Sequence, residues 1–175
     1  PQKPLAPDEQ SPATAEPAQA SRDKATPSTE CSAMPQSVPE NCIRLYSDGS
    51  HRYRDQTGTY AWEAGYYEGD VWRQIAKGGG KCSEKDNPNV QLTSTRMEAL
   101  GVLRGRQWIE KIEWNGKVAV WLDNQSTVTR FAKHQTERHK KCWKKADNDV
   151  WAAMREIDPK QTTLHWVEGH PEKRK

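Results

Sequence analysis

The chain has 175 residues, and its 27 Lys and Arg against 24 Asp and Glu give a formal net charge of +3. It contains no run of eighteen apolar residues and no secretory apolar segment, so this stretch supports neither membrane insertion nor export. We therefore expect a soluble intracellular protein of the cytoplasm or nucleus. The four cysteines, Cys31, Cys42, Cys82 and Cys142, are far apart and form no CxxC pair, so free thiols are expected instead of a disulfide framework.

The first forty residues differ in composition from the rest. They hold eight of the eleven prolines, and their only large apolar residues are Leu5, Met34 and Val38. Such a segment buries too little apolar surface to offset the entropy lost on ordering. Residues 1–40 are therefore predicted to be a disordered linker or tail, and residues 41–175 a single domain.

Three strands are predicted next in the chain. Residues 42–48 (CIRLYSD) alternate in polarity and stop at the turn-forming SDGS, so the first strand is expected to end on Asp48. Residues 57–67 and 71–76 are rich in aromatic and β-branched types and are separated by the short EGD, which indicates a hairpin. Together they predict an antiparallel meander, followed by a flexible loop over the Gly-, Pro- and Asn-rich residues 78–89.

The stretch TSTRMEAL, residues 93–100, opens an amphipathic helix. At 100° per residue, an apolar, glycine-bearing arc collects Met97, Gly101, Val102, Gly105, Trp108, Ile109 and Ile112. Glu98 falls inside this arc, whereas Arg104 and Arg106 fall on the opposite side. A carboxylate aimed at the core needs partners, since burying an uncompensated charge is costly; the alternative is a Glu that favours the helix dipole and bends back to solvent.

The remaining elements are a strand, two short helices and a last strand. Residues 117–123 (KVAVWLD) are apolar on both faces, which is typical of a central parallel strand, and this strand also ends on an aspartate, Asp123. Residues 126–140 are weakly helical, a short helix follows with Asp147 or Asn148 as its cap, and residues 162–167 (TTLHWV) form the final strand.

Three acids are expected to meet at one edge of this sheet. Asp48 and Asp123 each end a strand, and Glu98 begins the helix between them. Clustered carboxylates repel one another unless cations neutralise them, and an all-oxygen ligand set suits Mg²⁺ or Mn²⁺. Two such ions would support phosphodiester hydrolysis. Each acid alone is open to a plainer interpretation as a turn residue or cap.

The signatures SDGS at Asp48, TSTRMEAL at Glu98, WLDNQS at Asp123 and WVEGH at His170 resemble, in the same order, those of type 1 ribonuclease H. The resemblance covers about residues 43–170 and is greatest to ribonuclease H-like domains beside retroelement reverse transcriptases. It implies an α/β fold with a mixed five-stranded sheet, an antiparallel three-strand meander plus two parallel strands, flanked by helices. It also implies Mg²⁺-dependent cleavage of the RNA strand of RNA/DNA hybrids, with a reverse transcriptase domain in the same polyprotein as a covalent partner.

The resemblance also implies roles for individual residues. Asp48, Glu98 and Asp123 would ligate two Mg²⁺ or Mn²⁺ ions, and His170, on a loop, would assist proton transfer or product departure. Nucleic acid would be contacted near the helix start, after Asp123 and along the basic KKCWKK stretch, by Ser94, Thr95, Gln125, Lys140, Lys141, Trp143 and Lys144. Plainer alternatives are a surface histidine, ordinary helix capping and a solvated charged face. Zinc held by Cys82, Cys142 and nearby histidines fits no standard spacing.

The sequence departs from the family pattern at two places. The family carries a fourth carboxylate on a final helix, and this chain stops at Lys175 with no Asp after Asp158. We therefore expect an incomplete domain that lacks this helix and leaves apolar surface on the sheet uncovered. A Gly-rich turn after DGS is replaced here by HRYRDQTG. The alternative functions are a catalytically impaired nucleic-acid-binding module and a nuclease of the same fold that acts on DNA.

Overall fold

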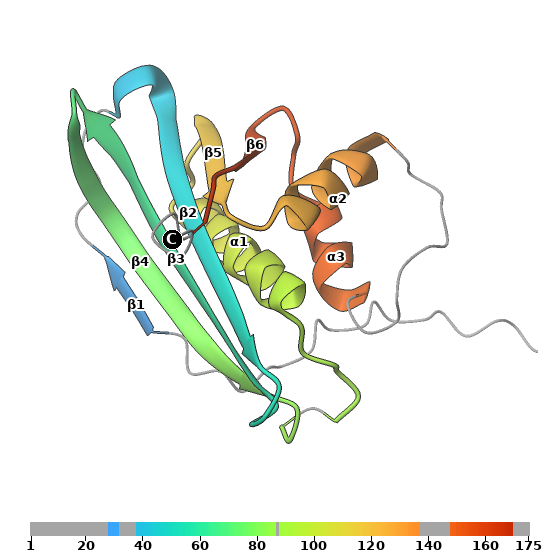
Figure 1. Ribbon diagram of the computed structural model, residues 1–175. Helices are drawn as coiled ribbons and strands as arrows, with labels where there is room; N and C mark the ends of the chain where they lie inside the picture. The colour runs from blue at the N-terminus through green and yellow to red at the C-terminus, as the bar shows by residue number, and fades with distance from the viewer. Residues whose placement is uncertain (1–27, 32–37, 87, 137–147, 170–175) are drawn as a thin grey trace, which may run out of the picture.

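A computed structural model describes residues 28–31, 38–86, 88–136 and 148–169. Six strands form one mixed sheet in the order β1-β4-β3-β2-β5-β6, with the helices beside it (Figure 1). The strands are β1 (Ser28–Cys31), β2 (Cys42–Arg52), β3 (Thr57–Glu68), β4 (Val71–Ser83), β5 (Lys117–Leu122) and β6 (Thr162–Trp166). A 3₁₀ turn, η1 (Pro39–Asn41), precedes β2. None of the helices in these ranges is long and apolar enough to cross a membrane.

The predicted architecture is confirmed. Strands β2, β3 and β4 form an antiparallel meander, and β5 joins β2 in parallel, followed by β6 parallel to β5. The turn between β3 and β4 contains Gly69 at a positive φ of 60°, a conformation that glycine adopts without the steric cost other residues have. The mixed sheet and its flanking helices are therefore those expected from the sequence, with one additional strand.

The additional strand, β1, corrects the prediction for the N-terminal segment. Residues Ser28–Cys31 lie inside the stretch expected to be disordered, yet they pair antiparallel with β4 from Ser28 opposite Gly79 to Cys31 opposite Ala76. Strand β4 would otherwise present the unpaired backbone groups of a sheet edge, and a short extended segment can satisfy them without a hydrophobic core of its own. The remaining residues of the predicted linker below residue 38 lie outside the described ranges.

Strand β2 is longer than predicted, so Asp48 lies inside the strand and not at its end. The ladder with β3 continues past Asp48, opposite Ala61, as far as Arg52, opposite Thr57. The glycine of SDGS has a packing role: a Cβ on Gly49 would lie 2.3 Å from the backbone nitrogen of Glu98. Glycine is needed for the close approach of this strand to the helix, not for a turn.

The prediction of a loop over the glycine-rich residues 78–89 is also wrong in part. Residues from Gly78 to Ser83 belong to β4 and pair with β3, whereas a turn at residues 84–86 begins the loop. The side chain of Trp62 lies over this stretch, and a Cβ on Gly78 would come within 2.7 Å of its ring. The glycines therefore leave room for aromatic side chains of the neighbouring strand.

Helix α1 (Ser94–Lys111) packs along the meander, mainly against β2 and β3, and α2 (Gln125–Thr136) and α3 (Asn148–Arg155) lie beside it (Figure 1). The predicted arc is the buried face: Met97, Val102 and Ile109 are fully buried, and Gly105 lies against Leu45. Arg106, expected on the exposed side, is instead 2% exposed and donates to Gln161 at 3.0 Å. The turn before β6 covers a second side of the helix that amphipathicity alone did not indicate.

The two faces of the sheet differ in how they are covered. Odd-numbered residues of β2, such as Ile43 and Leu45, are buried toward α1, with Val118 and Val120 of β5 beside them. Even-numbered residues of β2, including Tyr46 and Asp48, point to the opposite face. No helix of the described ranges packs on that face, which we call the open face.

Candidate active site

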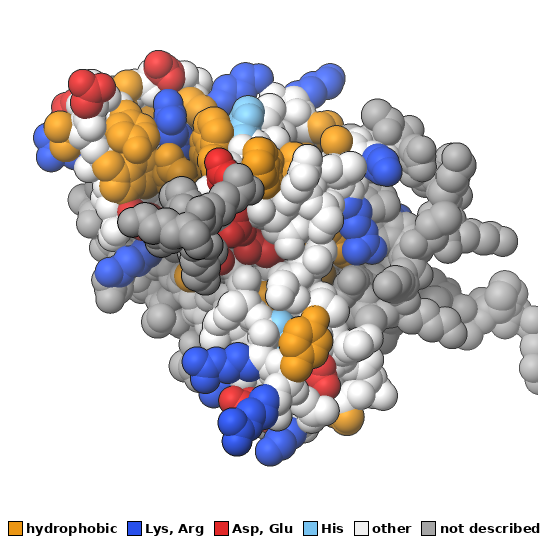
Figure 2. Space-filling view, viewed as in Figure 1, with side chains coloured by type: hydrophobic (Ala, Val, Ile, Leu, Met, Phe, Trp, Pro, Cys, Tyr) orange, Lys and Arg blue, Asp and Glu red, His pale blue; other side chains and the backbone are white. Residues whose placement is uncertain are grey.

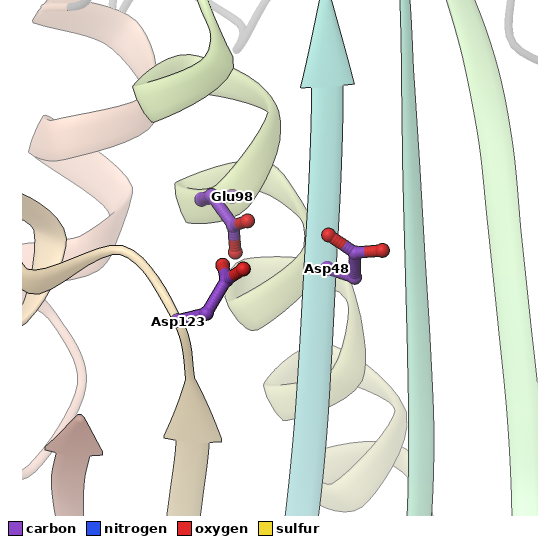
Figure 3. Close-up of side chains that lie close together, drawn as sticks. All are labelled: Asp48, Glu98 and Asp123. Atoms are coloured by element: carbon purple, nitrogen blue, oxygen red, sulfur yellow. The ribbon is translucent and has the colours of Figure 1, made fainter. Parts of the chain in front are cut away.

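The fold brings the three predicted acids together. Asp48 projects from the middle of β2, Glu98 from the N-terminal part of α1, and Asp123 directly follows β5 (Figure 3). One carboxylate oxygen from each lies within 4.8 Å of the others. The parallel pairing of β2 with β5, with Tyr46 opposite Trp121, explains why residues two positions further along each strand reach the same level.

Glu98 is the buried member of this cluster, at 2% exposure, whereas Asp48 is exposed. The backbone N–H of Gly49 donates to its Oε1 at 2.9 Å, and the hydroxyl of Ser47 donates to its backbone carbonyl at 3.2 Å. Burial raises the pKa of Glu98 to about 8; the Gly49 hydrogen bond opposes this rise, and the charges of Asp123 and Asp48 add to it. In the absence of a cation, the raised pKa favours the protonated form of this carboxyl at neutral pH.

The donor set of the cluster fits a divalent cation. Oε2 of Glu98 is buried, points toward the carboxylate of Asp123 (Figure 3) and receives no hydrogen bond from the described residues. A buried carboxylate oxygen opposite a second acceptor is unfavourable unless a proton or a cation lies between them. Carboxylate oxygens alone suit Mg²⁺ or Mn²⁺, since sulfur or nitrogen ligands would favour other metals.

The start of α1 is held by contacts that sequence reasoning missed. The N-cap is Thr93, whose hydroxyl accepts from the backbone N–H of Arg96 at 3.0 Å. Ser94 and Thr95, the predicted phosphate contacts, form the first turn, with Ser94 exposed and Thr95 half-buried. The threonine-first pattern TSTR is the sequence signal for this cap.

Arg96 connects α1 to α3. Its side chain is fully buried and makes two hydrogen bonds to Asp149, of 2.7 and 2.8 Å. Burial alone would raise the pKa of Asp149, but these bonds and the charge of Arg96 lower it. The pair therefore positions the helix that carries Glu98, and no local sequence signal joins two residues so far apart in the chain.

The segment after β6 lies against Asp123. The backbone N–H of Val167 donates to the carbonyl of Leu122 at 3.0 Å, and the indole N–H of Trp166 donates to the carbonyl of Asp123 at 3.1 Å. At Gly169, a Cβ would come within 2.2 Å of Oδ2 of Asp123. A side chain at position 169 would therefore displace the carboxylate of Asp123.

The other predicted site residues are not brought into this cluster by the described contacts. Gln125 is exposed at the first position of α2, two residues beyond Asp123. The remaining predictions lie outside the described residues: His170 and the basic stretch with Lys140, Lys141, Trp143 and Lys144. The zinc alternative has no cluster among the described residues: Cys82 is buried and forms no disulfide, and His139 and Cys142 lie outside the described ranges.

A groove of about 560 Å³ adjoins the acids on the open face. Its walls combine Asp48 and Asp123 with the aromatic side chains of Tyr46 and Trp121. Trp121 stacks on His165 of β6, with ring centroids 4.5 Å apart. The sequence predicted that KVAVWLD would be apolar on both faces, and Trp121 occupies the face on which no described helix packs.

Comparison with known proteins identifies the fold. The ribonuclease H1 of the halophilic archaeon Halobacterium salinarum NRC-1 superimposes with a TM-score of 0.53 over 76% of this chain and 90% of its own, at 15% identity. The protease-reverse transcriptase of prototype foamy virus superimposes with a TM-score of 0.54 at 14% identity, over 75% of this chain but 18% of its own. No protein-family model and no curated protein sequence matches the chain. The similarity at this identity confirms the ribonuclease H fold expected from the sequence.

Proposed function

We propose that this chain, which has the ribonuclease H fold, is a divalent-metal-dependent endonuclease that hydrolyses the RNA strand of RNA/DNA hybrids. The observation that carries the proposal is the cluster of Asp48, Glu98 and Asp123. One carboxylate oxygen of each residue lies within 4.8 Å of the others, and the buried Oε2 of Glu98 has no hydrogen-bond donor among the described residues. The Halobacterium protein of the same fold is a ribonuclease H1, which supports the same reaction class.

Asp48, Glu98 and Asp123 would hold the metal, as two Mg²⁺ or Mn²⁺ ions. When bound, such ions supply Lewis-acid stabilisation of phosphoryl oxygens and lower the pKa of a water molecule. The protein supplies fixed positions: the Gly49 N–H orients Glu98, the parallel strands set the separation of the two aspartates, and Arg96 with Asp149 fixes α1. Since Asp48 and Asp123 are accessible from solvent, a phosphodiester can approach from the open face.

Other parts of the proposal rest on the sequence. His170 follows Gly169, which lies against Asp123, so a role for its imidazole in proton transfer or product departure fits that position. Ser94, Thr95, Gln125 and the Lys-rich stretch around Trp143 are proposed contacts to the nucleic-acid backbone. A reverse transcriptase domain covalently linked in the same protein is a proposed partner, in line with the foamy virus protein.

The test is a strand-specific cleavage assay. The chain is incubated with an RNA/DNA hybrid, a DNA duplex and an RNA duplex, each labelled on either strand, in Mg²⁺, in Mn²⁺ or with a chelator. We expect metal-dependent cuts in the RNA strand of the hybrid only, and none after Asp123→Asn. Asp70→Asn, in the distant β3–β4 turn, is the matched control and should cut normally.

Each alternative has its own result in this assay. Cuts in the DNA duplex would replace the proposal with a DNA nuclease of the same fold. Retention of the hybrid without any cut would support the catalytically impaired binding module. Equal cleavage by the Asp123→Asn and Asp70→Asn variants would show that the acidic cluster is not the active site.

A further inference from the structure

A second hollow lies on the open face beyond Asp48. It has a volume of about 190 Å³ and is lined by two cations and three hydroxyl-bearing residues, Ser50, Arg52, Thr57, Thr59 and Lys81. Two of these residues, Arg52 and Thr57, belong to HRYRDQTG, the segment that stands in place of a Gly-rich turn, and Ser50 directly precedes it. The site described above makes no use of them.

The strand register places this pocket on the same face as Asp48. Asp48, Ser50 and Arg52 alternate along β2, so their side chains point to one side. Ser50 is opposite Thr59, which in turn is opposite Lys81, and Arg52 is opposite Thr57. Directly paired residues of an antiparallel ladder share a face. The lining residues therefore lie on the same face as Asp48, in the two rows of paired residues that follow it along β2.

The pocket is positively charged and rich in donors. Its lining contains no acid, and within the described residues neither Arg52 nor Lys81 forms an ion pair. The hydroxyls of Ser50 and Thr59 are 2.9 Å apart and share one hydrogen bond, which leaves one of the two O–H groups free to donate outward. Lys and Arg side chains gather at the lower end of the molecule in Figure 2, where Figure 1 has the β2–β3 turn.

We propose that Arg52 and Lys81, with the hydroxyls of Thr57 and Thr59, bind a backbone phosphate of a polynucleotide that lies across the open face. This inference rests on the proposed nuclease function, because the carboxylates that would act on a phosphodiester lie on the same strand and face. Arg52 lies four positions after Asp48 along β2, about 13 Å away, which would correspond to roughly four nucleotide steps of one strand of a duplex lying along β2. The subsite would therefore hold the backbone a few nucleotides from the cut and fix its register.

The experiment measures binding, so it does not depend on cleavage. Fluorescence anisotropy of a labelled RNA/DNA hybrid and of a DNA duplex is followed over a range of salt concentrations in a buffer with chelator. For Arg52→Gln/Lys81→Gln we expect at least about tenfold weaker binding, as for loss of a charged hydrogen bond. The slope of log affinity against log salt should fall by roughly one unit for both duplexes, because phosphate contacts carry no base information.

Two control variants make the test specific. Arg104→Gln/Lys111→Gln removes the same charge from α1, on the other side of the sheet, and should leave affinity and slope close to those of the unaltered chain. The charge-conserving Arg52→Lys/Lys81→Arg should retain the salt slope. This result would show that the loss in Arg52→Gln/Lys81→Gln comes from the missing charges and not from damage to the fold. Circular dichroism verifies that all variants are folded.

Three results would overturn the subsite: a slope for Arg52→Gln/Lys81→Gln equal to that of the control, a loss confined to the hybrid, or no binding of either duplex by the unaltered chain. Failure of the nuclease proposal is seen separately, in the cleavage assay. A chain that cuts hybrids but keeps its full salt slope without Arg52 and Lys81 refutes the subsite alone.

Discussion

Glu98 is held in a position that is unfavourable for an ionised carboxylate unless a cation is bound. It is buried beside two other acids, and the N–H of Gly49 donates a hydrogen bond to its carboxylate. Its pKa is raised to about 8 from an ordinary value of 4.5, chiefly by burial. Sites that bind divalent metals through carboxylates have this character, since the ligands repel one another until the cation binds.

This pKa predicts a pH-dependent stability in the absence of divalent ions. Between about pH 4.5 and pH 8 the folded chain keeps a proton on Glu98 that the unfolded chain has lost, so the free energy of unfolding falls as pH rises through that window. Glu98→Gln should remove this contribution. Urea unfolding at pH 5.5 and 8.5 gives the free energy of unfolding of both chains, and the value for the variant minus the value for the unaltered chain should be larger at pH 8.5 than at pH 5.5. The same difference at both pH values would contradict the raised pKa.

Gly49 is predicted to be intolerant of any side chain. A Cβ there would lie 2.3 Å from the backbone nitrogen of Glu98 and 2.5 Å from the carbonyl carbon of Met97, so α1 would have to move. We expect Gly49→Ala to destabilise the fold by about 1–3 kcal/mol, the usual cost of overpacking, and to abolish hybrid cleavage. Chemical denaturation measures the first effect. Ser50→Ala, at the exposed neighbouring position, should change stability little, and a Gly49→Ala chain as stable as Ser50→Ala would refute the close approach.

The three acids were predictable from sequence because each stands in a short signature whose local structure is simple. Glu98 was identified from helical periodicity, and Asp123 from the end of an apolar strand. Asp48 was predicted for the wrong reason, since SDGS was interpreted as a turn, whereas Gly49 serves the packing of α1 within a continuing strand. Residue type alone does not distinguish a glycine in a turn from a glycine beneath a helix.

At the scale of elements, α1 is fixed at its N-terminal end by the pair of Arg96 and Asp149. The Arg96 side chain is fully buried and that of Asp149 is 30% exposed. Asp149→Ala leaves a buried guanidinium without its carboxylate, for which we expect a loss on the order of 3 kcal/mol. Thermal or urea unfolding measures this loss.

A matched control comes from the same helix. Glu110 lies 3.5 Å from Arg106 and is itself 60% exposed, and a glutamine there keeps an acceptor oxygen for the buried guanidinium, so Glu110→Gln should cost less than about 1 kcal/mol. If both variants lost the same stability, the pair between α1 and α3 would not be the anchor. Periodicity predicted the buried face of α1 toward the sheet, but not the second contact with α3, because such a contact depends on residues more than fifty positions away.

At the scale of the whole molecule, the cluster joins β2, α1 and the end of β5, so an ion bound there ties together elements far apart in sequence. We expect Mg²⁺ or Mn²⁺ at one hundred times its dissociation constant to raise the free energy of unfolding at neutral pH by about 2.7 kcal/mol, measured as an increase in the unfolding midpoint. The increase should be retained in Asp70→Asn and absent from Asp48→Asn. A metal-dependent increase of equal size in both variants would place the cation elsewhere.

The overall topology followed from the sequence, since the order of strands and helices and the parallel apolar strand left few arrangements. Two features did not. The pairing of Ser28–Cys31 with β4 involves backbone groups, which a composition dominated by proline and polar residues does not reveal. The open face, with its groove and basic pocket, emerges only when the register shows which side chains of β2, β3 and β4 share a side.

We propose that Asp48, Glu98 and Asp123 act together as the catalytic centre. The most direct measurement is the single-turnover rate of hybrid cleavage in Mg²⁺ by the unaltered chain and by Asp48→Asn, Glu98→Gln and Asp123→Asn, with Asp70→Asn as control. Loss of groups that merely support a metal ligand costs about 10–100-fold, so each ligand replacement should reduce the rate by more than about 100-fold while Asp70→Asn does not. A folded variant of any of the three that cuts as fast as the unaltered chain would contradict the account.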